Sequence, residues 1–317
     1  MWIYINGEFF TKDQAKVSVL DRGYLYGDAV FETMRICRGR VFRLRQHLER
    51  LQASTRAISL DIPPISRMEE AVYETVRKNG MDEAILRLSL SRGETEKPGL
   101  DISEGKPTLV IVVRPFTPYP DHLFQQGISV VTVATPRGSG FLPQIKSANF
   151  LTNILAKQEA AARGAFEGIM LDEDGYVTEG SISNIFIIDR AGQLVTPPAH
   201  SLLKGITREV VIELAQQEGL ITYQKRMTRY DLFTASESFL TFTSAGIMPV
   251  VKVDERKIGE GKVGPLTEHL RQLYEGLLGT HVDKSRTCHF CSCENRGGND
   301  KKKQCGNIRG EVRGNEI

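Results

Sequence analysis

The main body of this 317-residue chain is nearly free of cysteine: Cys37 lies there alone, and the other four cysteines follow residue 280. A disulfide framework is therefore excluded from the main body, which is typical of proteins in a reducing compartment. No apolar run approaches the ~20 residues that a membrane-spanning helix needs. The segment Met1–Gly7 lacks the basic and apolar stretches of a signal peptide. We therefore expect a cytoplasmic protein with no membrane partner.

An excess of charge of either sign is absent as well. The chain has 41 Lys and Arg against 39 Asp and Glu, so its net charge is +2. This balance gives no reason to expect nucleic acid as a partner. The hydrophobic content of 40% is ordinary for a globular protein with a core, and 317 residues suffice for two domains.

Apolar spacing predicts a mixed order of strands and helices. Strands are expected over 2–5, 30–36, 84–91, 108–113, 128–133, 221–224 and 238–243, with strand-turn-strand units over 168–195. Helices are expected over 43–57, around 68–76, over 206–217 and over 265–278. The continuous apolar run at 108–113 indicates a strand buried on both faces, and Asp21-Arg22-Gly23 indicates a turn. Without a steady strand–helix alternation, the order predicts an α+β fold.

A proline-rich stretch divides the chain. Residues 115–120 read Pro-Phe-Thr-Pro-Tyr-Pro, so 115–122 is predicted to link an N-terminal α+β domain (1–114) to a C-terminal domain (123–279). The remaining 280–317 are polar and contain glycine and three consecutive lysines. Such a composition predicts a disordered tail.

Lys146 is the first candidate for a catalytic residue. Pro143 ends the preceding segment, and an apolar stripe follows at helical spacing, formed by Phe150, Leu151, Ile154 and Leu155. This pattern predicts that Lys146 begins a helix with a buried face. A desolvated lysine can form a Schiff base with an aldehyde cofactor. An ordinary surface lysine is the alternative that spacing leaves open.

Glu179 is the second candidate. It lies between two strand-like runs, in the segment 176–181. A carboxylate in such a place can hold the protonated pyridine nitrogen of pyridoxal phosphate (PLP), which makes the cofactor an electron sink. A plain turn glutamate is the alternative.

Several short motifs follow one another in register. They are Asp21-Arg22-Gly23-Tyr24, Tyr26-Gly27-Asp28-Ala29-Val30-Phe31-Glu32, Arg50, Lys146-Ser147-x-Asn149, Thr178-Glu179-Gly180-x-x-x-Asn184, Gly205-Ile206-Thr207-Arg208 and Met248-Pro249-Val250. Together they resemble the class IV (fold type IV) PLP-dependent aminotransferases, which include branched-chain aminotransferases, D-amino acid aminotransferases and aminodeoxychorismate lyases. The resemblance covers residues 1 to about 278. It implies an N-terminal α/β sandwich, a C-terminal pseudo-barrel that binds PLP, and a homodimer in which a pocket loop comes from the partner.

The resemblance also implies a cofactor site. Lys146 would be the catalytic lysine that carries PLP and moves the substrate proton, and Glu179 would hold the ring nitrogen. The phosphate would be bound by Arg50, Gly205, Ile206, Thr207, Thr243 and Ser244. A helix that opens at Gly205 offers free N–H groups to a phosphate, although a plain N-cap explains the same residues. His47, beside Arg50 in the sequence, is interpreted as structural.

Substrate choice rests on weaker and conflicting patterns. Residues 91–98 lack the histidine of the Arg-x-His trap that D-amino acid enzymes carry, while Ile85-Leu86-Arg87 keeps only the arginine of the branched-chain Tyr-x-Arg. The lysine segment is short, as in D-enzymes and lyases, and lacks the tyrosine that would bond the cofactor's phenolic oxygen. We favour L-Leu, L-Ile and L-Val with 2-oxoglutarate; a D-amino acid aminotransferase or a lyase is the alternative.

The expected substrate-binding residues are Tyr26, Phe31, Arg87, Ser244 and Ala245. Aromatic side chains suit an aliphatic substrate, and Arg87 would bind the distal carboxylate of 2-oxoglutarate. A strand-edge charge with no substrate is the other interpretation of Arg87.

The tail suggests a function of another class. It contains Cys288-His289-Phe290-Cys291, a metal half-site by its spacing, with Cys293, Cys305 and His281 nearby. The spacing of the remaining ligands is irregular, so we predict no metal. A zinc- or nucleic-acid-binding tail is kept as the non-enzyme alternative.

Overall fold

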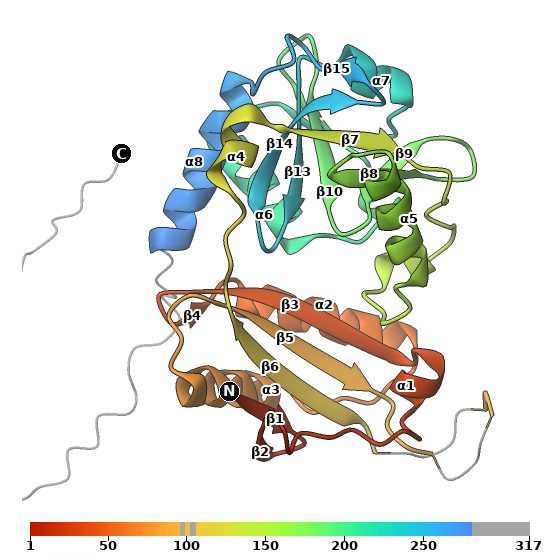
Figure 1. Cartoon of the computed structure of the whole chain (residues 1–317), viewed down its shortest axis with the longest axis vertical. Coiled ribbons are helices and arrows are strands. Elements are labelled where there is room, and N and C mark those ends of the chain that lie inside the picture. Colours follow the sequence, from red (N-terminus) through yellow and green to blue (C-terminus); the bar gives the residue numbers. More distant parts are fainter. Residues whose placement is uncertain (96–98, 102–105, 281–317) are drawn as a thin grey trace, which may run out of the picture. The chain divides into compact units, whose positions relative to one another are not determined.

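The computed structural model describes residues 1–95, 99–101 and 106–280. Within them the chain forms two sheets, each covered by helices (Figure 1). The predictions for the tail from residue 281 onward, including the Cys-x-x-Cys pair, lie outside the described residues. Among the described helices, none combines the length and the apolar character needed to cross a bilayer.

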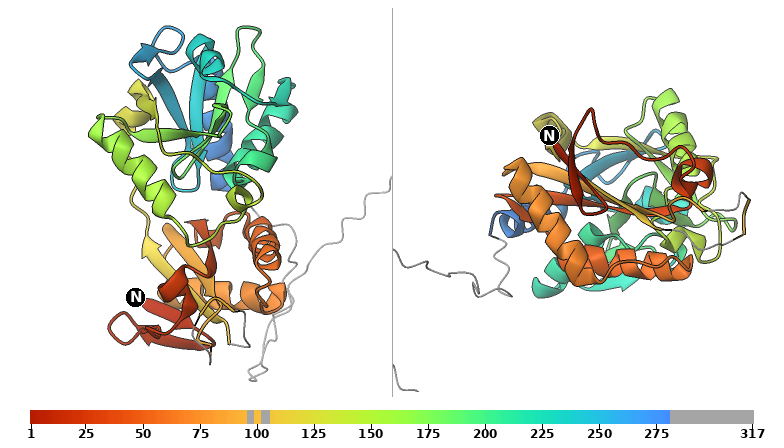
Figure 2. Two further views of the ribbon diagram at one scale, coloured as in Figure 1. Left: turned by 90° about the vertical axis from the view of Figure 1, so that its right-hand side faces the viewer. Right: turned by 90° about the horizontal axis from the view of Figure 1, so that it is seen from below.

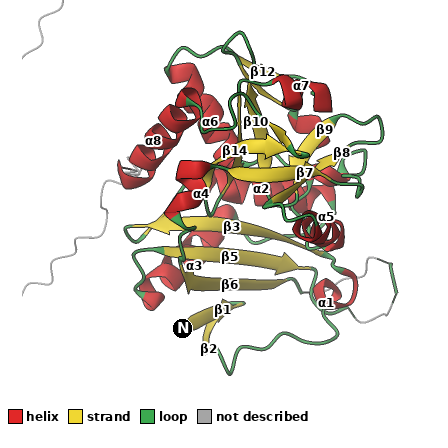
Figure 3. Cartoon of the chain, turned by 45° about the horizontal axis from the view of Figure 1, so that its top comes forward, coloured by secondary structure: helices red, strands yellow, loops and turns green. Residues whose placement is uncertain are grey.

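The first sheet is built entirely from antiparallel pairs. Its strands are β1 (Trp2–Ile5), β2 (Glu8–Thr11), β3 (Ala29–Cys37), β4 (Arg40–Val41), β5 (Ala84–Ser91) and β6 (Thr108–Pro115). They lie in the order β2-β1-β6-β5-β3-β4. Figure 3 shows five of them side by side, from β3 through β5, β6 and β1 to β2. The helices of this half are α1 (Arg22–Tyr26), α2 (Leu44–Ala57) and α3 (Ile65–Asn79).

Helices α2 and α3 cover one face of the first sheet (Figure 2). Leu44, Leu48 and Leu51 recur at helical spacing and are buried, so α2 packs by the stripe that the sequence shows. The predicted burial of 108–113 on both faces is wrong. Leu109, Ile111 and Val113 are buried in β6, whereas Val110 and Val112 are only partly buried. Helices cover one face only, so the strand alternates despite its continuous apolar run.

The second sheet closes on itself. Its strands are β7 (Ile128–Thr132), β8 (Glu167–Leu171), β9 (Val177–Gly180), β10 (Asn184–Ile188), β11 (Leu194–Thr196), β12 (Thr222–Gln224), β13 (Glu237–Phe242), β14 (Gly246–Val253) and β15 (Arg256–Lys257). The order is β12-β11-β10-β13-β14-β7-β8-β9, and β9 also pairs with β10. The strands β10, β13, β14, β7, β8 and β9 therefore form a ring, which confirms the expected pseudo-barrel.

The helices of this half pack outside the ring. They are α4 (Asp121–Gln126), α5 (Leu151–Ala162), α6 (Ile206–Gln217), α7 (Arg229–Thr234) and α8 (Pro265–Thr280), with the short 3-10 helices η1 (Leu142–Gln144) and η2 (Ala199–Ser201). α5 packs on β8, α6 packs on β13, and α8 packs on β13 and β14. The prediction of an α+β fold is confirmed.

Two local predictions are wrong. The expected turn at Asp21 is the start of α1, because the Asp21 side chain caps the helix by accepting from the N–H of Gly23 at 2.7 Å. The stripe of α5 is not its buried face: Leu151 is 69% and Ile154 50% exposed, whereas small residues such as Ala156 face the core.

The predicted domain boundaries stay a prediction. β6 ends at Pro115 and α4 begins at Asp121, so the proposed linker overlaps the start of a helix. Contacts among the described residues join both sheets into one compact unit.

Candidate active site

Lys146 lies in an extended loop that pairs with the first sheet. The N–H of Phe31 donates to the Lys146 carbonyl at 3.0 Å, and the N–H of Ala148 donates to the Ala29 carbonyl at 2.8 Å. Between these bonds, Ser147 forms a β-bridge with Val30. α5 begins only at Leu151, so the prediction that Lys146 opens this helix is wrong. Backbone hydrogen bonds to β3 hold the lysine in place.

The surroundings of Lys146 favour its neutral form. Burial and the positive charge of Arg50 lower its pKa to about 8, against the opposing effect of Glu32 and Glu179. Its Nζ lies 4.7 Å from the centre of the Phe31 ring. An amine with a pKa of about 8 is roughly one-tenth deprotonated at pH 7, far more than an ordinary lysine, and the neutral amine is the nucleophile and the base.

Glu179 is buried at the end of β9. Its carboxylate accepts from Asn184 Nδ2 at 3.1 Å and from the N–H of Leu203 at 3.2 Å, and it forms an ion pair with Arg137. Burial raises the pKa of Glu179, although Arg137 and the Leu203 N–H act in the opposite direction. Sequence reasoning missed Arg137 because it lies 42 residues from Glu179 in a loop with no periodic pattern.

Arg50 is held by Glu32 and by a backbone carbonyl. It donates to both oxygens of Glu32, from Nε at 2.8 Å and from Nη2 at 2.6 Å, and Nη1 reaches the Lys204 carbonyl at 2.8 Å. His47 donates from Nδ1 to Glu32 at 2.7 Å, a contact that agrees with the structural role expected for it. Burial raises the pKa of Glu32, but Arg50 and His47 outweigh it and bring the value to about 2. Glu32 belongs to one of the sequence motifs, but only the structure shows that it pairs with Arg50 and His47.

The start of α6 offers donors. Gly205 is its N-cap, and no side chain among the described residues caps the first turn. Thr207 is buried in that turn, and the buried Thr241 Oγ1 nearby has no hydrogen-bond partner within the described residues. An uncapped helix N-terminus with hydroxyls beside it is suited to a phosphate group.

One narrow cavity of about 70 Å³ collects most of the predicted site. It is lined by Arg50, Lys146, Glu179, Gly205, Ile206, Thr207 and Thr243, together with Arg137. Residues distant in the sequence and drawn from both halves of the chain thus meet at one place.

The other predicted residues lie outside this cavity. Ser244 and Ala245 line a separate space of about 420 Å³, which Thr243 also borders. The Arg87 guanidinium lies 3.7 Å from the centre of the Phe31 ring, the same ring that Lys146 approaches. Tyr26 lies in α1, where it is exposed and contacts Arg22.

The family described as amino-transferase class IV matches residues 29–253 of the chain. The chain belongs to this family. A protein of Methanocaldococcus jannaschii, whose name provisionally assigns it to the branched-chain-amino-acid aminotransferases, is 42% identical over 87% of this chain and 96% of its own length. A D-alanine aminotransferase of Staphylococcus aureus is 33% identical over 88% of this chain and 98% of its own length.

A solved structure agrees with this class IV aminotransferase throughout its fold. The branched-chain amino acid aminotransferase of Escherichia coli superposes with a TM-score of 0.84 at 32% identity. The match covers 90% of this chain and 97% of that one. The expected fold type of the family is therefore confirmed.

We expect the Glu32–Arg50 pair to make stability depend on pH. A carboxyl whose pKa falls from 4.5 to about 2 on folding adds roughly 3 kcal/mol above pH 4.5, which is lost as the pH falls toward 2. Glu32→Gln should therefore be less stable than the parent at pH 7, and this difference should shrink between pH 4.5 and 2. Urea unfolding across this range measures it; a constant difference would contradict the assignment.

Proposed function

We propose that this chain is a PLP-dependent aminotransferase that exchanges the amino group of an L-branched-chain amino acid with 2-oxoglutarate. The observation that carries the proposal is the convergence of Lys146, Glu179, Arg50 and the start of α6 on one cavity. The family and the names of its relatives support the reaction class. The near absence of cysteine from the main body favours the cytoplasm as its location.

The residues present fit PLP. Among the described residues, the start of α6 has no side-chain cap and the Thr241 hydroxyl has no partner; these groups and Arg50 would hold the phosphate. Glu179 would hold the ring nitrogen, and Lys146 would bind the aldehyde carbon. When bound, the cofactor supplies an electron sink for the pair left behind when the substrate loses its Cα proton.

The chain's own groups then have separate tasks. Lys146, with its pKa of about 8, removes the Cα proton of the amino acid that gives up its amino group, and delivers a proton to Cα in the half-reaction that makes the new amino acid. Glu179 is shielded from water, so its charge is an effective partner for a protonated ring nitrogen. Arg137 holds the carboxylate in place. The two hydrogen bonds to Glu32 fix the orientation of Arg50, which would bind the phosphate.

The substrate proposal rests on Phe31 and Arg87. Among the described residues, no carboxylate forms an ion pair with Arg87, and burial and Arg114 lower its pKa. A guanidinium without an ion-pair partner beside an aromatic ring can bind the second carboxylate of 2-oxoglutarate while the ring accepts an aliphatic side chain.

The D-alanine aminotransferase relative supports a second candidate function, the transamination of D-amino acids. A coupled assay with L-Leu, L-Val, D-Ala and 4-amino-4-deoxychorismate separates these activities and the lyase.

Lys146→Ala should abolish transamination while leaving the fold intact, because Lys146 is both the attachment point and the base. Turnover by coupled assay and the thermal melt by circular dichroism provide the two measurements. A folded variant with near-parental turnover would remove Lys146 from the mechanism.

Arg87→Ala should raise KM for 2-oxoglutarate roughly ten- to a hundredfold, the usual effect of losing a charge-assisted contact. The leucine half-reaction should stay close to normal, since an aliphatic side chain offers no charge to the guanidinium. Single-turnover absorbance follows each half-reaction separately. Equal losses in both would show that Arg87 binds the α-carboxylate or supports the strand.

We also propose a homodimer whose interface includes the outer face of α5. Leu151, Ile154 and Leu155 are about half exposed or more, and Phe141 and Leu142 lie exposed before the same helix. A cluster of exposed large apolar side chains is typical of a protein interface. A second copy of the chain is the expected occupant, in line with the resemblance.

Ile154→Lys should shift the protein to a monomer, because a charge would be buried at the interface. Light scattering coupled to gel filtration measures the mass. Ile221→Lys is the matched control: Ile221 is similarly exposed but lies before β12 and should leave the dimer unchanged. A dimeric Ile154→Lys protein would place the interface elsewhere.

A further inference from the structure

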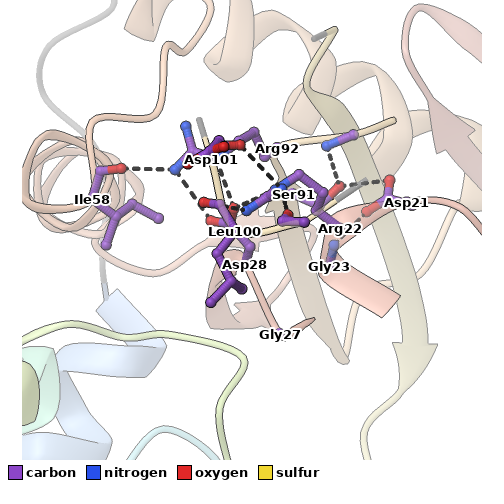
Figure 4. Close-up of polar contacts among 12 residues, drawn as sticks. Asp21, Arg22, Gly23, Gly27, Asp28, Ile58, Ser91, Arg92, Leu100 and Asp101 are labelled. Carbon is purple, nitrogen blue, oxygen red and sulfur yellow. Dashed lines mark hydrogen bonds and ion pairs between the residues drawn. The ribbon is translucent and has the colours of Figure 1, made fainter. Parts of the chain in front are cut away.

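Asp28 lies between two buried arginines (Figure 4). Its Oδ2 accepts from Arg22 Nε at 2.9 Å and from Arg92 Nε at 2.7 Å, and its Oδ1 accepts from Arg92 Nη2 at 3.2 Å. Arg22 is 4% and Arg92 6% exposed. Burial raises the pKa of Asp28, but the two arginines outweigh it and keep the pKa below its usual range. The carboxylate is therefore charged and holds both arginines.

The two guanidiniums also bind backbone carbonyls from separate parts of the chain. Arg22 Nη1 donates to Gly99 at 2.7 Å. Arg92 donates to Ser59 at 2.9 Å and to Ile58 at 2.7 Å, just after the end of α2. One carboxylate thus pairs with two positive charges, and carbonyl oxygens accept from other N–H groups of both arginines. Such a buried group is strongly coupled, because removing Asp28 takes the carboxylate away from two buried positive charges at once.

The same short segment that carries Asp28 holds the lysine loop. On one side, Asn149 Nδ2 donates to the Gly27 carbonyl at 3.1 Å, and the Ala29 carbonyl accepts from Ala148. On the other side, the Arg92 N–H donates to the Asp28 carbonyl at 3.1 Å. Gly27 has φ +69°, and a Cβ there would lie 2.4 Å from Asn149 Oδ1. The approach is so close that a shift of the segment also shifts the loop.

We propose that Asp28, held between Arg22 and Arg92, is a positioning residue for Lys146. It fixes the segment 27–31, and this segment fixes residues 146–149 through backbone and amide hydrogen bonds. Through their hydrogen bonds to backbone carbonyls, the arginines also connect this segment to Gly99 and to the residues that follow α2. The inference rests on the proposed role of Lys146 and adds the group that keeps this lysine in its partly buried position.

The consequence is measurable on the lysine itself. Burial is the largest cause of the lowered pKa of Lys146. If the segment 27–31 loosens, the loop moves toward water and the pKa of Lys146 rises from about 8 toward its ordinary value of 10.5. A loss of stability alone, with the loop still in place, would not move this titration.

The test uses the full chain freed of cofactor. Trace acetic anhydride labels free amines at a series of pH values, and peptide mass spectrometry reads the labelling of Lys146. In Asp28→Asn the midpoint should rise by about one unit, so labelling at pH 8 should fall roughly fivefold. Asp28→Glu keeps the carboxylate and should restore most of the parental curve.

The control is Glu83→Gln. Glu83 forms an ion pair with Arg35 near the opposite end of β3, so its loss perturbs the same strand away from the lysine loop. Its Lys146 curve should match the parent. If Asp28→Asn does not fold, Arg92→Lys replaces it, because it keeps the charge and loses the two-pronged contact. A folded Asp28→Asn or Arg92→Lys variant with the parental midpoint overturns the proposal, whereas an active Lys146→Ala enzyme overturns only the proposed function.

Discussion

The candidate active site depends on the pairing between the start of β3 and the lysine loop (residues 146–149). β5 occupies one edge of β3 along its length, while β4 pairs only with Ile36 and Cys37 at the far end of the other edge. The start of that second edge is therefore free for residues 146–148. Because buried backbone N–H and C=O groups need partners, this pairing satisfies both segments and brings the lysine from the second half onto the first sheet.

Charge balance then decides the chemistry. The pKa of Lys146 depends on three charged neighbours, since Arg50 lowers it and the carboxylates of Glu32 and Glu179 raise it. Desolvation favours the neutral amine, and the two carboxylates limit this effect. Glu32 holds Arg50 with two hydrogen bonds. Burial thus accounts for the lowered pKa of Lys146, and the pairing with Glu32 fixes the orientation of Arg50.

Regular elements were predictable where one face of an element packs. The spacing of Leu44, Leu48 and Leu51 predicted α2, and the limits of α6 were predicted to the residue. The α5 stripe was misread because helical spacing shows an apolar face without showing what covers it. α1 was missed because a helix of one turn has no periodicity, although Asp21 is a good N-cap. α7 and β14 were not predicted either.

The sequence by itself determined the family, the mixed fold and most residues of the candidate site, because the motifs carry residue types that the cofactor's chemistry requires. Only the tertiary structure decided which of them meet. It joined Arg50 and His47 to Glu32, placed Arg137 against Glu179, and set Ser244 and Ala245 in a separate space. These contacts join residues far apart in the chain and depend on how the sheets and loops pack. Spacing along the sequence contains no information on that packing, which is why it could not reveal them.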